Sequence, residues 1–303
     1  MGAFASCLSI VSLYGRFLRR SVTAAGLSSQ TVEIDGDTTI HFWGPTGRAA
    51  TSKPQLVLIH GFGPPSIWQW WKQISFFARD FDVYVPDLVF FGHSFTNSSE
   101  RSEIFQATCV AKLLEKLGIR SYSVVGTSYG GFVAYRMAAM WPERVEKVVI
   151  ASSALNMRPG DNDGLLKKAN VEKIEDLLVP VTAQHLRKLL HFVVLRRLYI
   201  PNFLLNDFID KLYSENRKEK LQLLKGLSIG QDHTVNISPL SQEVLIVWGE
   251  QDQIFSLEKA TQLKTLVGET ARLQVIKNTS HVPQLEQPAH FNNILDNFLH
   301  DLS

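Results

Sequence analysis

The sequence has few cysteines and no long apolar run. Its 303 residues include only Cys7 and Cys109. Cys7 lies near the amino terminus and Cys109 lies in a helical pattern, so we expect no disulfide between them and a reducing, cytoplasmic location. No apolar stretch approaches the roughly 20 residues that a membrane-spanning helix needs. With neither a disulfide nor a membrane-spanning helix expected, the fold must be stabilised by its hydrophobic core.

A dominant charge and metal-binding patterns are also missing. The chain carries 31 Lys and Arg against 29 Asp and Glu, a net charge of +2, which gives no sign of a nucleic-acid surface. Neither an HExxH motif nor a cluster of cysteine and histidine occurs, so no metal or other cofactor is expected. With 45% hydrophobic and 20% charged residues, the chain suits one large α/β domain, or a domain with an insertion.

The most informative stretch runs from Tyr122 to Ala138 and reads YSVVGTSYGGFVAYRMA. An apolar, β-branched run precedes Gly126, and helix-forming residues follow Gly131. This is the G-x-S-x-G nucleophile elbow in the strand–turn–helix context that the motif requires. Gly126 and Gly130 carry no side chain that would collide where strand and helix approach each other. We therefore predict that Ser128 is a nucleophile at the tip of the turn.

A second segment predicts the groups that stabilise an oxyanion. The run QLVLIH, from Gln55 to His60, is typical of a strand buried on both faces. In elbow enzymes, one oxyanion donor is the amide after the nucleophile, here that of Tyr129. The other comes from the loop after the third strand, here the amide of Phe62. Losing one such donor costs about 2.7–4 kcal/mol of transition-state stabilisation. His60 itself is expected to hold its own loop.

A serine hydroxyl needs an imidazole to take its proton and a carboxylate to orient that imidazole. Two further buried-strand patterns, Glu243 to Trp248 and Leu273 to Ile276, are each followed by a polar loop. The first loop contains Asp252 and the second contains His281. In elbow enzymes the chain order is serine, acid, histidine, with acid and base after later strands. Ser128, Asp252 and His281 satisfy both order and placement.

Other ionisable residues compete for these roles. Glu250 is the rival acid, but it lies closer to its strand than Asp252 does. His233 lies in the helical insertion and His290 inside a helix, so both are weaker candidates for the base. Asp87 and His93 follow another buried strand and are expected to fix their loop by hydrogen bonds.

Between Ser152 and Leu240 the alternation of strands and helices stops, and leucine-rich helical patterns punctuated by proline follow. We interpret this segment as a helical cap over the site. Its apolar faces either line a lipophilic acyl or alcohol pocket or only pack against the core. Tyr199 and Tyr213 are candidate pocket residues, whereas Trp68 and Trp71 are expected in the core.

Residues 1–30 form a leader ahead of the core. Its apolar residues recur at helical spacing, three arginines follow, and no acid occurs before Glu33. One interpretation is a basic amphipathic helix that lies on the domain or makes peripheral membrane contact through residues 1–20. A second is an organelle transit peptide. A third is a lipid anchor, because Gly2 and Ser6 fit the myristoylation pattern and Cys7 could take a second chain.

Together these motifs resemble the α/β-hydrolase superfamily, in the branch of capped esterases, monoacylglycerol lipases and epoxide hydrolases. They lie between about Thr31 and Ser303 and are HGFG at His60, PDL with FGHS at Pro86 to Ser94, GTSYGG at Gly126, WGEQD at Trp248 and NTSHVPQLEQP at Asn278. The resemblance implies an eight-stranded, mostly parallel sheet with helices on both faces and a cap after the sixth strand. It also implies a metal-free and cofactor-free serine mechanism. The expected organisation is a leader at 1–30, a core at 31–151 and 241–303, and a cap at 152–240.

The residue at the elbow narrows the reaction. Epoxide hydrolases and haloalkane dehalogenases place aspartate there, because an alkylated carboxylate is an ester that water can cleave. An alkylated Ser128 would be an ether, which is a dead end. We therefore expect a monomeric serine hydrolase that cleaves a lipophilic carboxylic ester through an acyl-enzyme. The alternatives are an acyltransferase on the same triad and a ligand-binding receptor with residual hydrolase activity, as some plant relatives of this fold are.

Overall fold

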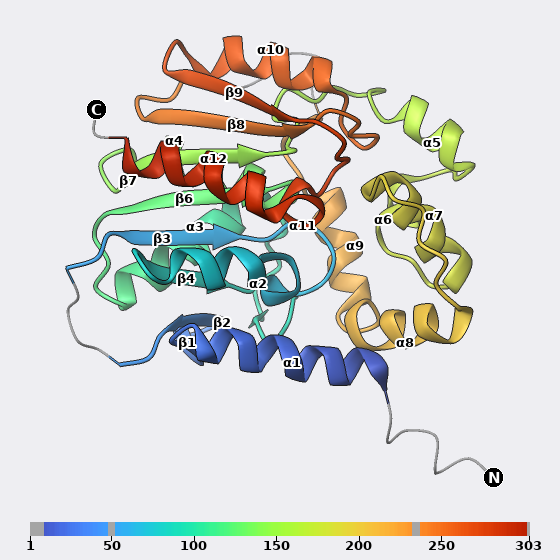
Figure 1. Ribbon diagram of the computed structural model, residues 1–303, viewed down its shortest axis with the longest axis horizontal. Coiled ribbons are helices and arrows are strands. Elements are labelled where there is room, and N and C mark those ends of the chain that lie inside the picture. Colours follow the sequence, from blue (N-terminus) through green and yellow to red (C-terminus); the bar gives the residue numbers. More distant parts are fainter. Residues whose placement is uncertain (1–8, 48–51, 232–236, 302–303) are drawn as a thin grey trace.

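The computed structural model describes residues 9–47, 52–231 and 237–301. Its apolar, β-branched runs form one sheet, with strand order β1-β2-β4-β3-β6-β7-β8-β9 (Figure 1). The bounds are β1 (Leu27–Asp35), β2 (Thr38–Pro45), β3 (Gln55–Ile59), β4 (Asp82–Pro86), β6 (Tyr122–Thr127), β7 (Val145–Ala151), β8 (Glu243–Gly249) and β9 (Ala271–Ile276). In the described ranges a ninth, two-residue strand, β5 (Phe95–Thr96), pairs with β2 outside this path.

The sheet is mostly parallel, which confirms the predicted fold class. Every neighbouring pair from β4 to β9 along the sheet is parallel. The exceptions are β1 with β2 and β2 with β4, which are antiparallel. The first of these pairs is a hairpin that turns at Gly36 and Asp37. The parallel strands bring their carboxyl ends to one edge, where sites of open α/β sheets lie.

Helices cover both faces of the sheet because its strands are apolar on both sides. Successive residues of β3 alternate: Val57 and Ile59 pack into one core cluster, and Leu56 and Leu58 pack into the other. The first cluster includes buried residues of α3 (Glu103–Lys116), α4 (Tyr129–Met140) and α10 (Leu257–Val267). The second includes those of α1 (Ile10–Ala24), α2 (Ser66–Phe77) and α12 (Pro288–His300).

The cap is the group of helices between β7 and β8, at the carboxyl ends of the strands (Figure 1). Its members are α5 (Asp163–Ala169), α6 (Ile174–Leu178), α7 (Ala183–Val193), α8 (Asn202–Leu212) and α9 (Arg217–Lys225). Leu186 and Leu189 of α7 and Leu205 and Ile209 of α8 form a buried cluster of their own. On the eight-strand path β7 is the sixth strand in sequence, so the cap enters where the resemblance placed it.

The leader helix α1 docks on the domain. Leu18 and Val22 are fully buried against the core, and the hydroxyl of Ser9 donates to Asp207 of α8 at 2.8 Å. Strand β1 begins at Leu27, which is inside the predicted leader. Leu27 is buried in the same core cluster as Leu18 and Val22, so the core includes the end of the predicted leader. Within the described ranges, no helix has both the length and the apolarity to cross a bilayer. The residues of the lipid-anchor interpretation, Gly2, Ser6 and Cys7, lie outside these ranges.

Candidate active site

Ser128 occupies a sharp turn between β6 and α4. Its backbone has φ 53° and ψ −120°, a conformation that is strained for a residue with a side chain. The turn is held by hydrogen bonds from the Ser128 amide to the Ala151 carbonyl at 2.8 Å and from the Gly131 amide to the Ser128 carbonyl at 2.9 Å. The Ser153 hydroxyl also donates to the Ser128 carbonyl, at 2.6 Å. These bonds fix the strained backbone and leave the Ser128 hydroxyl at the tip.

The glycines around Ser128 allow the helix to approach the strands closely. A Cβ on Gly126 would lie 2.1 Å from the Gly130 carbonyl oxygen. A Cβ on Gly130 would lie 2.3 Å from the Ile59 carbonyl oxygen of β3. Both distances are far below van der Waals contact, and the clashing atoms are backbone. The elbow therefore needs glycine at both positions, as the motif predicted.

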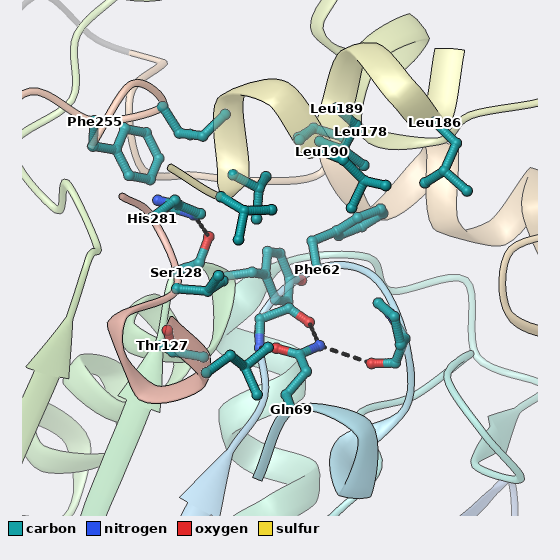
Figure 2. Close-up of a pocket in the computed structure, with 18 of the residues that line it drawn as sticks. Phe62, Gln69, Thr127, Ser128, Leu178, Leu186, Leu189, Leu190, Phe255 and His281 are labelled. Atoms are coloured by element: carbon teal, nitrogen blue, oxygen red, sulfur yellow. Dashed lines mark hydrogen bonds between the residues drawn. The ribbon is translucent and has the colours of Figure 1, made fainter. Parts of the chain in front are cut away.

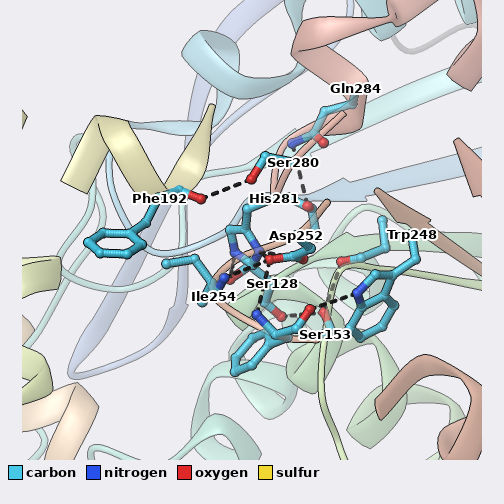
Figure 3. A network of polar contacts seen from close by, with 12 residues as sticks. Ser128, Ser153, Phe192, Trp248, Asp252, Ile254, Ser280, His281 and Gln284 are labelled. Carbon is cyan, nitrogen blue, oxygen red and sulfur yellow. Dashed lines mark hydrogen bonds and ion pairs between the residues drawn. The ribbon is translucent and has the colours of Figure 1, made fainter. Parts of the chain in front are cut away.

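The structure brings the three residues of the predicted triad together (Figure 3). His281 Nε2 lies 2.9 Å from Ser128 Oγ. On the other side of the ring, His281 Nδ1 lies 2.9 Å from Asp252 Oδ2 and 3.1 Å from Asp252 Oδ1. A proton on Nδ1 directed at the carboxylate leaves Nε2 free to accept the hydroxyl proton of Ser128.

The carboxylate of Asp252 is fixed by the backbone of its own loop. Its side chain is fully buried, and Oδ1 accepts hydrogen bonds from the amides of Ile254 at 2.8 Å and Phe255 at 3.0 Å. The Trp248 indole donates to the Phe255 carbonyl at 2.9 Å and anchors the far end of this loop. The rival acid, Glu250, is exposed and accepts from the Asn278 amide at 3.3 Å, so it does not face the imidazole.

Sequence reasoning missed a residue that joins the histidine loop to the cap. Glu286 of α11 (Pro283–Glu286) accepts from the amide of Ser280 at 2.7 Å and from the amide of Leu195 at 2.8 Å. Two further bonds cross the same boundary, from the His281 amide to Val193 at 3.1 Å and from the Ser280 hydroxyl to Phe192 at 2.9 Å. The cap and the loop of the candidate base are thus held in a fixed relation.

The loop after β3 lies directly against the elbow. A Cβ on Gly61 would lie 3.0 Å from the Thr127 carbonyl oxygen and 3.1 Å from Ser128 Cβ. Phe62 and Tyr129 line the same cavity as Ser128, with their rings edge to face at 5.9 Å. The Tyr129 amide is in the first turn of α4, where helix amides have no partner within the helix. The two predicted oxyanion donors therefore come from adjacent segments beside the hydroxyl.

Gln69 holds this loop, and no sequence motif marked it. Its Oε1 accepts from the Gly61 amide at 2.9 Å. Its Nε2 donates to the carbonyls of Gly61 at 3.0 Å and Pro64 at 2.7 Å. Gln69 is buried on α2, and Figure 2 shows its amide bracing the loop beneath Phe62. The side chain acts as a brace for the segment that carries the Phe62 amide.

Two other predictions about this loop region are confirmed. His60 is buried, burial lowers the pKa of its imidazole, and its Nε2 accepts from the Leu88 amide at 2.9 Å. Asp87 accepts from the Ser66 amide at 2.8 Å and contacts His41 at 2.8 Å. Burial acts to raise the pKa of Asp87, but hydrogen bonds and neighbouring imidazoles, His41 above all, lower it overall. Both side chains fix loops.

The prediction that His93 fixes its loop by a hydrogen bond is wrong as far as the described residues show. His93 is exposed, and its ring packs edge-on against His41 at 5.3 Å between centroids. Of the weaker candidates for the base, His290 is exposed on α12, and His233 lies outside the described residues. Among the candidate bases that the structure describes, His281 is the one that faces the serine.

A second hydrogen-bonded series of serine, histidine and aspartate shows why these hydrogen bonds alone do not define an active site. Ser29 Oγ lies 2.8 Å from His41 Nε2, and His41 Nδ1 lies 2.8 Å from Asp87 Oδ2. Ser29, however, is an exposed residue within strand β1 and is not part of the cavity around Ser128. Strand β1 continues after Ser29, so no helix begins directly behind it to supply unpaired amides. We interpret this series as a structural link that holds β1, β2 and the loop after β4 together.

Ser128 opens into a cavity of about 1100 Å³ between core and cap (Figure 2). Its lining is mainly apolar and includes Leu178, Leu186, Leu189 and Leu190 of the cap, Phe62, Phe255, and Ile10 and Tyr14 of α1. Tyr213 lines the cavity, whereas Tyr199 is 99% exposed. Trp68 packs against two buried clusters, as expected, but it also lines the cavity, between Tyr14 and Phe208. It faces the cavity because α1 and α8 meet over α2.

Comparisons with known proteins agree with the fold. The model of the alpha/beta hydrolase fold family matches residues 54–288, and the chain belongs to this family. Human monoacylglycerol lipase ABHD6 is 25% identical over 261 residues, which cover 82% of this chain and 75% of that protein. A 2-hydroxy-6-oxononadienedioate/2-hydroxy-6-oxononatrienedioate hydrolase of a Pseudomonas species is 27% identical over 298 residues, covering 92% and 99%. Carboxylesterase CesB of Bacillus subtilis superposes with a TM-score of 0.74 at 19% identity, covering 96% and 99%. The protein is a hydrolase of the lipase- and esterase-like branch.

The brace formed by Gln69 generates a prediction. Gln69→Leu should lower kcat and kcat/KM together by about 10- to 100-fold, because a misplaced oxyanion donor is felt in the transition state. The measurement is steady-state hydrolysis of a chromogenic ester. Gln73→Leu is the matched control: Gln73 is also buried on α2 but contacts Gln284 and Asn292 instead of the loop. Equal losses in the two variants would contradict a role for Gln69 in positioning.

Proposed function

We propose that the protein is a serine hydrolase that cleaves a lipophilic carboxylic ester, in the manner of a carboxylesterase or monoacylglycerol lipase. One observation carries the proposal. The Ser128 hydroxyl lies at a strained elbow, 2.9 Å from the imidazole of His281, and opens into a large apolar cavity.

The geometry supports a two-stage acyl transfer. His281 Nε2 takes the hydroxyl proton as Ser128 Oγ attacks the ester carbonyl, and the carboxylate of Asp252 stabilises the imidazolium. The amides of Phe62 and Tyr129 donate to the oxyanion. The tetrahedral species collapses when His281 returns the proton to the leaving alcohol, which leaves an acyl group on Ser128. Water then gives a proton to His281 and attacks the acyl carbon. His281 returns that proton to Ser128 Oγ as the bond from Oγ to the acyl carbon breaks, which releases the acid and the free serine.

The cavity supports the choice of a lipophilic substrate. Ligand pockets are commonly about 300–1,000 Å³, and this one, at about 1100 Å³, can hold a long hydrocarbon chain. Leucines of α6 and α7 form its roof (Figure 2). The names of two relatives, a monoacylglycerol lipase and a carboxylesterase, point to substrates of the same kind. An apolar cavity of this size favours an ester with an extended acyl chain.

The reaction is tested by turnover of p-nitrophenyl esters and of a monoacylglycerol. Ser128→Ala should reduce kcat by at least about 10³-fold, because removing the nucleophile leaves only binding and the oxyanion donors. Equal rates for wild type and Ser128→Ala would contradict the proposal. Products are also analysed with an added alcohol: a transferred ester as main product would indicate an acyltransferase instead. Thermal stabilisation by esters without any turnover would indicate a receptor.

Chain-length preference tests the role of the cap. Leu186 lines the cavity on the side away from Ser128 (Figure 2). Leu186→Trp should shorten the cavity and lower kcat/KM for long-chain esters about 10-fold more than for acetate and butyrate esters. Val181→Trp is the control, because Val181 is a half-exposed cap residue outside the cavity lining. The same loss across all chain lengths would show that the long chain does not reach Leu186.

A further inference from the structure

Helix α1 has an apolar face that the domain does not cover. Ile10, Leu13, Tyr14 and Phe17 are 50%, 45%, 42% and 49% exposed. Their spacing of three and four residues places them on one side of the helix. Another side of the same helix, with Leu18 and others, is buried on the core. The uncovered side chains therefore form a continuous stripe, which we call the α1 stripe.

The α1 stripe is continuous with the catalytic cavity. Ile10 and Tyr14 belong to the stripe and also line the cavity, so the cavity reaches the surface at this helix. Tyr14 stacks on Phe17 at 5.8 Å and packs on Trp68 of the cavity wall at 5.4 Å. Leu198 of the cap likewise lines the cavity and is 48% exposed.

The beginning of α8 extends the stripe. Asp207 of α8 accepts hydrogen bonds from the Ser9 hydroxyl at 2.8 Å and the Val11 amide at 3.1 Å, which fixes α8 beside the start of α1. Phe203 is one helical turn before Asp207, on the same side of α8, and is 64% exposed. Exposed apolar groups thus lie on two docked helices at the place where the cavity meets the surface.

Positive charge borders this surface. Arg16, Arg19 and Arg20 are all exposed, and α1 contains no acidic residue. At about 100° per residue, Arg16 and Arg20 fall next to the α1 stripe. An apolar face edged by arginine fits the boundary between acyl chains and anionic headgroups. A partner protein with an apolar groove would need no such flanking charge.

We propose that the α1 stripe and the beginning of α8 dock the protein on an anionic lipid surface, with the entrance of the catalytic cavity facing that surface. The substrate then passes from the lipid layer into the cavity without crossing water. This inference rests on the proposed function only for the nature of the substrate, because docking itself needs no turnover.

Docking is tested by co-sedimentation of the full chain carrying Ser128→Ala with phosphatidylcholine vesicles, with and without phosphatidylserine. Binding should require phosphatidylserine. Adding Leu13→Glu and Phe17→Glu should weaken it at least about 10-fold, and adding Arg16→Gln and Arg20→Gln should weaken it about 10- to 30-fold. The controls are Ile104→Glu with Leu266→Glu, at exposed apolar positions of α3 and α10, and Lys167→Gln with Lys168→Gln on α5.

A second measurement links docking to turnover in the active protein. The Leu13→Glu, Phe17→Glu variant should hydrolyse a soluble short-chain ester at the wild-type rate and lose about 10-fold on a monoacylglycerol embedded in mixed vesicles. Unchanged vesicle binding in both the Leu13→Glu, Phe17→Glu variant and the Arg16→Gln, Arg20→Gln variant would overturn the inference. The inference would also be overturned if the wild-type protein were a dimer that Leu13→Glu and Phe17→Glu convert to a monomer, since a second copy would then cover the α1 stripe. Vesicle binding that depends on the stripe, in a protein that cleaves no ester, would support docking while the proposed function fails.

Discussion

The close approach of α4 to strands β6 and β3 is the constraint on which the rest of the site depends. The helix can begin directly after Ser128 only because Gly126 and Gly130 leave room for backbone atoms that a Cβ would meet at 2.1 and 2.3 Å. This packing forces the serine to φ 53° and lifts its hydroxyl out of the turn. The same packing directs the first amides of α4 toward the space beside the Ser128 hydroxyl. One tight contact thus provides both the nucleophile and an oxyanion donor.

The remaining groups are positioned by side chains that touch no substrate. Gln69 fixes the loop of the second oxyanion donor. The amides of Ile254 and Phe255 fix the carboxylate of Asp252. Glu286 ties the loop of His281 to the cap. The roof of the cavity and the base of the triad are therefore parts of one hydrogen-bonded unit.

Much of this arrangement could be predicted from the sequence because it depends on local patterns. Buried strands appear as apolar runs, and the elbow, the acid and the histidine each follow such a run in a fixed order. The roles of Gln69 and Glu286 could not be predicted, because each acts on a segment that only the tertiary fold brings near. Helical spacing predicts that Trp68 faces the core, but it does not show that a cavity also lies against that face. The sequence places His93 in a loop, but it does not show whether the side chain points into the loop or out to solvent.

The proposed chemistry requires a single nucleophile that is activated by its folded surroundings. Mass spectrometric peptide mapping after treatment with a long-chain alkyl fluorophosphonate measures this most directly, because the reagent phosphonylates an activated serine. The account predicts one adduct, on the peptide that contains Ser128, which an excess of a long-chain ester slows and which does not form in the unfolded protein. An unmodified Ser128, or an adduct at another residue such as Ser29, would contradict it.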